Sequence, residues 1–166
     1  MSKIRLDIDT REHQDKNQWI LDYFFENDIS YRYVSMPTAD YSLTDDKSIL
    51  VDRKSGLMEV AQNCFQDHTR FRNEMIRAKE NNQKLYILIE DEFIYNLNGV
   101  QHFKIPRYKS TTKKHKKGQP MAFFNPETLM KTMQTQEEKY GIKYMFCSHW
   151  NVPRTIIKIL TQNAKS

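Results

Sequence analysis

Two short apolar segments separated by a polar run constrain the fold of this chain more than any other feature. Residues 41–43 and 49–51 are rich in strand-forming side chains, and residues 44–48 between them read Thr-Asp-Asp-Lys-Ser. Polar runs of this kind turn a β-hairpin. We therefore expect two antiparallel strands, with the residue before the first strand held beside the end of the second.

Charged residues gather at the open end of that hairpin. Asp40 precedes the first strand, and Asp52 and Lys54 close the second. Alternation along a strand puts Asp52 and Lys54 on one face and Arg53 on the other. Two carboxylates beside a lysine can hold a hard divalent cation, with an ammonium close enough to orient a water. The alternative interpretation is a solvated hairpin with scattered charges.

Outside the hairpin, strand patterns and helix patterns alternate along the chain. Strand patterns cover residues 4–9, 29–36, 84–90 and 142–147. Helical spacing of apolar residues covers residues 14–26, 57–63, 69–81, 125–140 and 153–160. A hairpin combined with strand–helix alternation predicts an α/β three-layer sandwich, in which a central mixed β-sheet is flanked by helices. Residues 93–97 fit either a short strand or a helical turn.

Apolar stripes on the helical segments are more typical of core than of binding surfaces. The stripe on the first helical segment consists of Trp19, Ile20, Tyr23 and Phe24, widened by Leu21 and Phe25. The stripe on the last segment consists of Ile156, Ile157, Ile159 and Leu160. We expect both stripes to pack against the sheet.

Three short blocks carry the acidic residues that bear most on function. They read Asp-Thr-Arg-Glu at residues 9–12, Ala-Asp-Tyr at residues 39–41 and Val-Asp-Arg-Lys-Ser at residues 51–55. In order and separation they resemble the nuclease domain of the XPF-type structure-specific endonucleases, which belong to the PD-(D/E)xK nuclease superfamily. The resemblance covers nearly the whole chain and implies a restriction-endonuclease-like fold. It also implies hydrolysis of DNA phosphodiester bonds assisted by Mg²⁺ or Mn²⁺.

The resemblance can be carried over residue by residue. The acids that match metal ligands of the family are Asp40, Asp52, Glu12 and Asp9. The residues that match its catalytic positions are Asp40, Asp52, Arg53 and Lys54. Two further basic residues are implied to contact DNA or to fix a neighbouring phosphate, Arg11 and Arg70.

The chain departs from the family pattern at three positions. Ala39 stands where the family usually has glycine, a small change if the backbone there does not need a positive φ. Asp52 replaces the usual glutamate, which shortens the ligand by one methylene. The last acid of the family motif falls on Met58, and Glu59, one place later, is the candidate to replace it.

Residues 98–120 lack clear periodicity and concentrate positive charge. Their basic residues are Lys104, Arg107, Lys109, Lys113, Lys114, Lys116 and Lys117. Removing these seven charges would take the net charge from +5 to −2. Long segments without secondary structure are usually functional or disordered. Clustered lysines suit contacts with the phosphates of nucleic acid, and a flexible insertion that only aids solubility is the alternative.

Length and composition set the remaining bounds. We expect one stand-alone nuclease domain over residues 1–166, with a basic loop at about 98–120 and without the helix–hairpin–helix domain of the family. No run is long and apolar enough for a membrane span, and two cysteines are too few for a disulfide scaffold. A cytoplasmic location in a bacterium or a phage-infected cell fits this composition. Zinc ligation by Cys64, His68, Cys147 and His149 is much less expected than buried cysteines and surface histidines.

These observations favour a metal-dependent endodeoxyribonuclease that acts on branched, flapped or junction DNA. The alternative is a catalytically inactive DNA-binding or regulatory module with the same fold. Retention of Asp40, Asp52 and Lys54 favours the enzyme, because an inactive relative has no chemical need for all three. Because nuclease domains of the resembled family pair through the region of this last helix, a homodimer is a second interpretation of the last apolar stripe.

Overall fold

A six-stranded β-sheet forms the centre of the computed structural model, which describes residues 3–12, 14–121 and 124–163. The strands are β1 (Arg5–Asp9), β2 (Ser30–Val34), β3 (Tyr41–Leu43), β4 (Ile49–Lys54), β5 (Lys84–Glu90) and β6 (Lys143–Cys147). Their order across the sheet is β2-β1-β3-β4-β5-β6. β3 pairs antiparallel with β1 and β4, whereas β1–β2, β4–β5 and β5–β6 are parallel. The predicted hairpin and mixed sheet are confirmed.

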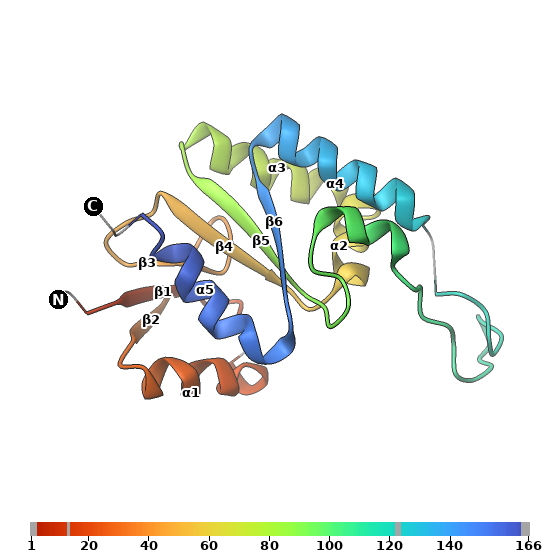
Figure 1. The fold of residues 1–166 in the computed structure, drawn as a ribbon, viewed down its shortest axis with the longest axis horizontal. Helices are drawn as coiled ribbons and strands as arrows, with labels where there is room; N and C mark the ends of the chain where they lie inside the picture. The colour runs from red at the N-terminus through yellow and green to blue at the C-terminus, as the bar shows by residue number, and fades with distance from the viewer. Residues whose placement is uncertain (1–2, 13, 122–123, 164–166) are drawn as a thin grey trace.

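Helices cover both faces of this sheet, as Figure 1 shows. The helices are α1 (Gln18–Glu26), α2 (Leu57–Phe65), α3 (His68–Glu80), α4 (Pro126–Tyr140) and α5 (Val152–Leu160). Three short 3-10 helices are η1 (Gln14–Lys16), η2 (Leu97–His102) and η3 (His149–Asn151). α1 and α5 lie on one face and α2, α3 and α4 on the other. The predicted three-layer α/β sandwich is therefore confirmed.

The two faces of the central strands build two separate apolar cores. On β5, Ile87 and Ile89 point into the core under α2, α3 and α4, whereas Leu88 points into the core under α1 and α5. All three side chains are fully buried. A strand covered on both faces needs apolar residues throughout, which explains the unbroken run from Leu85 to Ile89. Burial of such side chains contributes about 1.5–3 kcal/mol each.

The helix predicted over residues 14–26 is interrupted near its start. η1 ends at Lys16, and α1 begins only at Gln18. Between them the buried Asn17 donates its amide to Glu12 (3.2 Å) and accepts from Arg53 (2.5 Å), so its side chain serves tertiary contacts rather than the helix. The apolar stripe is narrower than predicted, because the side chain of Phe25 is 85% exposed, whereas Leu21 and Phe24 are buried.

The last apolar stripe is core, as predicted. Ile156, Ile159 and Leu160 on α5 are buried against the sheet and α1, and Ile157 is partly buried. Pairing of two copies through this region stays a prediction. No helix within the described part of the chain is long and apolar enough to cross a membrane.

The segment from residue 91 to residue 121 differs most from its prediction. Residues 93–96 form neither a strand nor a helical turn, and the 3-10 helix η2 begins at Leu97 and occupies the start of the predicted irregular loop. Beyond η2, residues 103–121 project from the body of the protein (Figure 1). Arg107 pairs with Pro120 as an isolated bridge, and the Tyr108 ring stacks on His115 with 4.2 Å between centroids. The basic loop is thus ordered by its own contacts.

Candidate active site

The hairpin places Asp40 at the open end of β4 by backbone hydrogen bonds. The Asp40 N–H donates to the Val51 carbonyl (2.9 Å), and the Arg53 N–H donates to the Asp40 carboxylate (2.8 Å). The Asp40 carboxylate is therefore fixed beside the backbone of the strand that carries Asp52 and Lys54. This is the convergence that the hairpin pattern predicts.

Asp52 and Lys54 lie on the same face of β4, as strand alternation predicts. Lys54 Nζ lies 3.0 Å from Asp52 Oδ2, and both side chains are buried. The ammonium also lies over the Phe71 ring of α3, 5.5 Å from its centroid. Burial lowers the pKa of Lys54, but the neighbouring charges of Asp52, Glu59 and Asp40 outweigh burial and raise it. The neighbouring carboxylates therefore keep the Lys54 ammonium protonated and in place.

The carboxylates of Asp40 and Asp52 repel each other. Burial, the charge of Asp52 and the charge of Glu12 together raise the pKa of Asp40 well above its usual range. Asp52 Oδ2 is buried and accepts no aligned hydrogen bond from the described residues, despite the nearby ammonium of Lys54. Two crowded carboxylates, one of which raises the pKa of the other, fit a hard divalent cation, which prefers oxygen ligands.

The other two predicted acids make different contacts. The Asp9 carboxylate is buried, accepts the Met36 N–H (2.8 Å) and pairs with Arg11. The Glu12 carboxylate accepts the Tyr41 hydroxyl (2.7 Å) and the Asn17 amide. No three Asp, Glu, His or Cys side chains gather at metal-binding separations within the residues that the structure describes. Asp40 and Asp52 lie close enough for the charge of Asp52 to raise the pKa of Asp40, and metal ligation by Glu12 and Asp9 stays a prediction.

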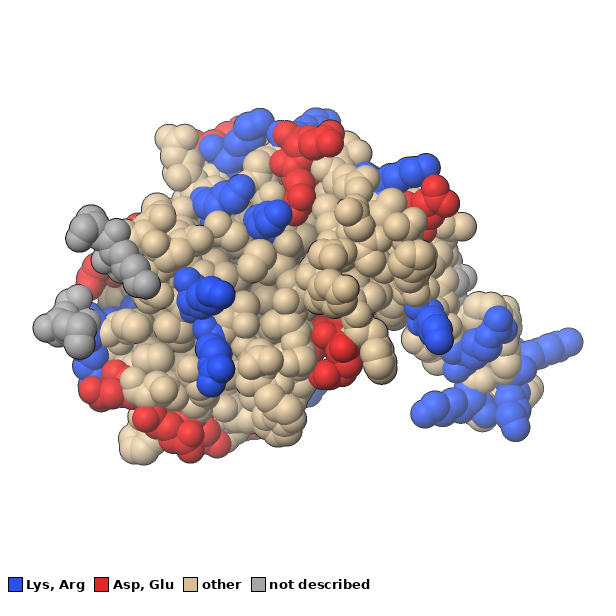
Figure 2. All heavy atoms as spheres, in the orientation of Figure 1, with Lys and Arg blue, Asp and Glu red and all other residues tan. Residues whose placement is uncertain are grey.

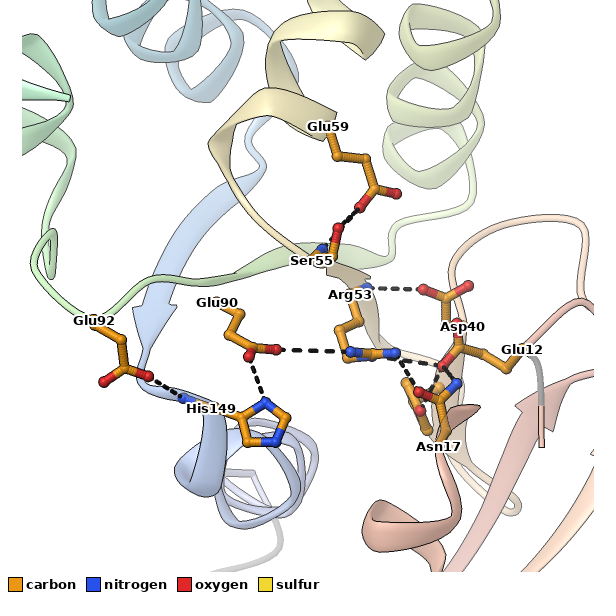
Figure 3. A network of polar contacts seen from close by, with 10 residues as sticks. Glu12, Asn17, Asp40, Arg53, Ser55, Glu59, Glu90, Glu92 and His149 are labelled. Atoms are coloured by element: carbon orange, nitrogen blue, oxygen red, sulfur yellow. Dashed lines mark hydrogen bonds and ion pairs between the residues drawn. The ribbon is translucent and has the colours of Figure 1, made fainter. Parts of the chain in front are cut away.

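Arg53 belongs to a second polar network on the opposite face of β4 (Figure 3). Its guanidinium donates to Asn17, and it lies 3.6 Å from the Glu12 carboxylate and 3.9 Å from the Glu90 carboxylate. Glu90 in turn lies 2.5 Å from His149 Nδ1. Arg53 therefore ties β4 to the ends of β5 and β6 and to α1, while only its backbone contacts Asp40.

Helix α3 contributes two residues that the sequence interpretation missed. Phe71 lies beneath Lys54, and the Glu74 carboxylate accepts the Ala39 N–H (2.9 Å). Burial and the charge of Asp52 raise the pKa of Glu74. Arg70, the α3 residue predicted to contact DNA, is exposed to solvent. Helical spacing alone does not show which face of α3 meets the site, because Glu74 interrupts the apolar stripe between Phe71 and Met75.

Glu59 lies at the start of α2 and apart from Asp40 (Figure 3). Its carboxylate accepts the backbone N–H (2.8 Å) and the hydroxyl (2.9 Å) of Ser55. A carboxylate in the first turn also complements the helix dipole. Its charge still acts on Lys54 by raising the pKa of that ammonium. Its use as the last acid of the motif stays a prediction.

The backbone before Asp40 adopts a conformation that the sequence interpretation left open. Ala39 has φ 69° and is 1% exposed, so this position does require a positive φ. The left-handed region costs about 1–2 kcal/mol for a residue with a Cβ. The hydrogen bond from Ala39 to Glu74 helps to hold this turn, which aims Asp40 at β4.

Substitutions at Ala39 should reveal this strain. We expect Ala39→Gly to change the free energy of unfolding by less than ~0.5 kcal/mol, because relief of the positive φ offsets the lost methyl and the added chain entropy. Ala61→Gly, at a buried helical position, should destabilise by about 1–2 kcal/mol. Urea denaturation measures both, and equal losses would contradict strain at Ala39.

The basic residues predicted to contact DNA lie on the projecting loop, away from the carboxylates. Figure 2 shows Lys and Arg gathered on the projecting lobe, which residues 103–121 form. The basic residues there are all exposed: Lys104, Arg107, Lys109, Lys113, Lys114, Lys116 and Lys117. Arg107 donates to the Gly118 carbonyl (2.7 Å) and so stabilises the loop itself. The lysine side chains form no ion pair within the described residues and remain available for phosphates.

Known proteins resemble this chain in sequence profile and in fold. The sequence profile of the ERCC4 domain matches residues 8–160, whereas no curated protein sequence matches the chain. XPF from Aeropyrum pernix has a similar structure, with 18% identity, a TM-score of 0.64 and 97% of this chain covered. A second structure of that protein, in complex with DNA, has 16% identity, a TM-score of 0.65 and 98% covered. This chain spans only 65% and 66% of those two chains.

The match to the ERCC4 domain includes every block of the candidate site from Asp9 to Lys54 and extends to the end of α5. The likeness to solved structures independently supports the nuclease fold. The chain belongs to the ERCC4 domain family of nucleases.

Proposed function

We propose that this chain is a divalent-cation-dependent endonuclease that cuts DNA with branches, flaps or junctions. The observation that carries the proposal is the convergence of Asp40, Asp52 and Lys54 at one end of β4. Two acids and a lysine in this arrangement match the chemistry of phosphodiester hydrolysis. The basic loop adds a surface for the DNA backbone, and the known complex of a structurally similar XPF with DNA supports DNA as the partner.

Asp40 and Asp52 would hold Mg²⁺ or Mn²⁺ through their carboxylate oxygens. When bound, the cation supplies Lewis acidity toward a phosphate oxygen and lowers the pKa of a bound water. Lys54 would stabilise the negative charge that develops on the phosphate, because its ammonium is held next to Asp52. Glu12 and Asp9 would act by holding Tyr41 and Arg11 in place.

Arg53 would position the site rather than touch the phosphate. Its backbone N–H fixes Asp40, and its guanidinium joins α1, β4 and β5 on the opposite face of the sheet. Arg11, which follows β1, and Arg70, which lies on α3, are both exposed. They would contact phosphates beyond the scissile one. The seven basic residues of the loop would bind the DNA backbone without reading sequence.

Cleavage of end-labelled DNA tests this function. Flap, fork, four-way-junction and plain duplex DNAs are incubated with Mg²⁺, Mn²⁺ or a chelator. We expect metal-dependent cutting that prefers a branched substrate and falls about 100- to 1,000-fold in Asp52→Asn and in Lys54→Ala. Asp46→Asn and Lys158→Ala alter exposed residues remote from the site and should cut as the wild type does.

The alternative function predicts a different result. A wild-type protein that binds these DNAs but cuts none of them with either metal would be a DNA-binding module that uses the same fold. Equal cutting by the wild type and both site variants would contradict the assignment of Asp52 and Lys54.

A further inference from the structure

Three large aromatic side chains are exposed after strands that end at the same edge of the sheet as β4. Phe93, Tyr95 and Trp150 are 89%, 81% and 77% exposed. Phe93 and Tyr95 follow β5, and Trp150 follows β6. Because β4, β5 and β6 are parallel, these residues emerge at the edge where β4 ends with Lys54. Two strand spacings separate the ends of β4 and β6, or about 10 Å.

The surroundings of Trp150 hold its ring in place and leave it open to solvent. The ring packs edge-on against His149 (4.7 Å between centroids) and against Trp19 (5.9 Å). His149 stacks on Trp19 at 4.1 Å and pairs with Glu90. Trp150 therefore rests on a support that is connected through Glu90 to Arg53. An aromatic ring fixed in this way loses little freedom when a flat ligand covers it.

Phe93 and Tyr95 lie on a turn that is tied to the same support. The Asp91 carboxylate accepts the N–H groups of Phe93 and Ile94, both at 2.8 Å. The Asp91 N–H donates to the Cys147 carbonyl at 2.9 Å, and Glu92 accepts the His149 N–H at 3.1 Å (Figure 3). These bonds place the turn after β5 against the residues that follow β6.

A cavity of about 410 Å³ opens beside this turn. Phe93 lines it together with Lys104 and His102, so an aromatic face and a cationic side chain border the same space. Asp91 also lines the cavity, but its carboxylate is engaged by the turn. A nucleotide combines a flat base with a phosphate, which matches this pairing of groups.

The character of the edge favours a nucleic-acid ligand over a protein partner. Docking surfaces for proteins are contiguous apolar patches, whereas polar residues, Glu92 and Asn96 among them, are interspersed with these three aromatic residues. Rings that stand free suit stacking with successive unpaired bases, which is tolerant of sequence. Bases inside a duplex are already stacked and cannot use such rings.

We propose that Phe93, Tyr95 and Trp150 form a stacking site for unpaired nucleotides of DNA, adjacent to the cleavage centre. This inference deepens the proposed function, on which it rests, because it names single-stranded DNA next to the scissile bond as the recognised feature. The stacking site would hold the unpaired strand while the basic loop contacts backbone phosphates.

Binding of single-stranded DNA tests the stacking site without requiring cleavage. Labelled oligothymidylate and a duplex of equal length are titrated in chelator, and fluorescence anisotropy gives the affinities. We expect Trp150→Ala and the Phe93→Ala/Tyr95→Ala pair each to weaken oligothymidylate binding about tenfold, with little effect on the duplex. Phe25→Ala removes an equally exposed ring on α1 and should change neither. Oligothymidylate should also quench tryptophan emission, and less so in Trp150→Ala.

The outcomes separate this inference from the proposed function. A triple variant combines Phe93→Ala, Tyr95→Ala and Trp150→Ala. Unchanged oligothymidylate affinity in this triple variant would overturn the stacking site, even if metal-dependent cleavage persists. A stacking defect in a protein that cuts no DNA would support the site and overturn the nuclease. If the triple variant converts a dimer to a monomer in sedimentation and binds oligothymidylate as before, the edge is an interface between copies, and the inference fails.

Discussion

Asp40→Asn is expected to abolish DNA cleavage and at the same time to stabilise the metal-free protein. Cleavage should fall about 100- to 1,000-fold, because one of the two carboxylates proposed to hold the cation is lost. The asparagine can keep the hydrogen bond from the Arg53 N–H, and it removes the repulsion between Asp40 and Asp52. We expect a gain of about 1 kcal/mol, or about 2–4 °C in Tm.

The gain should depend on pH in a defined direction. The pKa of Asp40 is raised in the folded protein, so its favourable contribution is complete below the ordinary aspartate pKa and is lost as pH rises through the raised value. The stability difference between Asp40→Asn and the wild type, measured in chelator, should therefore grow as pH rises above the ordinary aspartate pKa. Thermal denaturation followed by circular dichroism measures it.

Asp46→Asn provides a control of opposite sign. Hydrogen bonds from Ser48 lower the pKa of Asp46, so its contribution to stability is present above the ordinary aspartate pKa and is lost as pH falls. The substitution should leave cleavage intact and should slightly destabilise the protein at neutral pH. If the stability difference between Asp40→Asn and the wild type stays constant with pH, the inferred repulsion between Asp40 and Asp52 would be contradicted.

Neutralising the tip of the basic loop is expected to weaken DNA binding strongly and to leave the fold intact. The four substitutions are Lys113→Gln, Lys114→Gln, Lys116→Gln and Lys117→Gln. Each phosphate contact adds about 0.9 to the slope of log affinity against log salt, so the slope should drop by up to about 3.6. At moderate salt the affinity should fall on the order of 10- to 100-fold for every DNA tested. Anisotropy titrations over a range of salt concentrations give both quantities.

The loop should keep its shape because backbone and aromatic contacts hold it. The Gly118 N–H donates to the Tyr108 carbonyl (2.8 Å), and Tyr108 stacks on His115. A control protein with four other exposed lysines replaced has the same net charge as the tip variant; these are Lys16, Lys131, Lys143 and Lys158. Equal losses of affinity in both proteins would show that only total charge matters and would contradict a specific role for the loop.

Most of the fold was predictable because its patterns involve residues that are close together in the sequence. The polar run between β3 and β4 and the apolar run of β5 each depend on neighbouring residues alone, and both elements formed as expected. The prediction failed where a tertiary partner decided the local structure. Asn17 interrupts a helical pattern because Arg53 and Glu12 use its side chain; Arg53 is 36 residues away in sequence, and Glu12 lies outside the predicted helix.

The same distinction holds for the candidate site. Strand alternation correctly put Asp52 and Lys54 on one face of β4, with Arg53 on the other. The sequence did not indicate the support from α3, because Phe71 and Glu74 reach the hairpin only through the packing of that helix. The basic loop shows no periodicity, and its order comes from turns and one aromatic stack rather than from a repeating pattern.

The projecting loop makes this protein an electric dipole. Seven of its positive charges stand on one arm, and the rest of the chain carries a net −2. A polyanion approaching from solution is attracted by the arm and repelled by the body, so encounters are oriented before any specific contact forms. Under the proposed function, the carboxylates of the site would then meet DNA that is already aligned, and a bound cation would reverse the local repulsion. DNA binding by the loop and cleavage at the carboxylates would thus occur at separate places and in sequence.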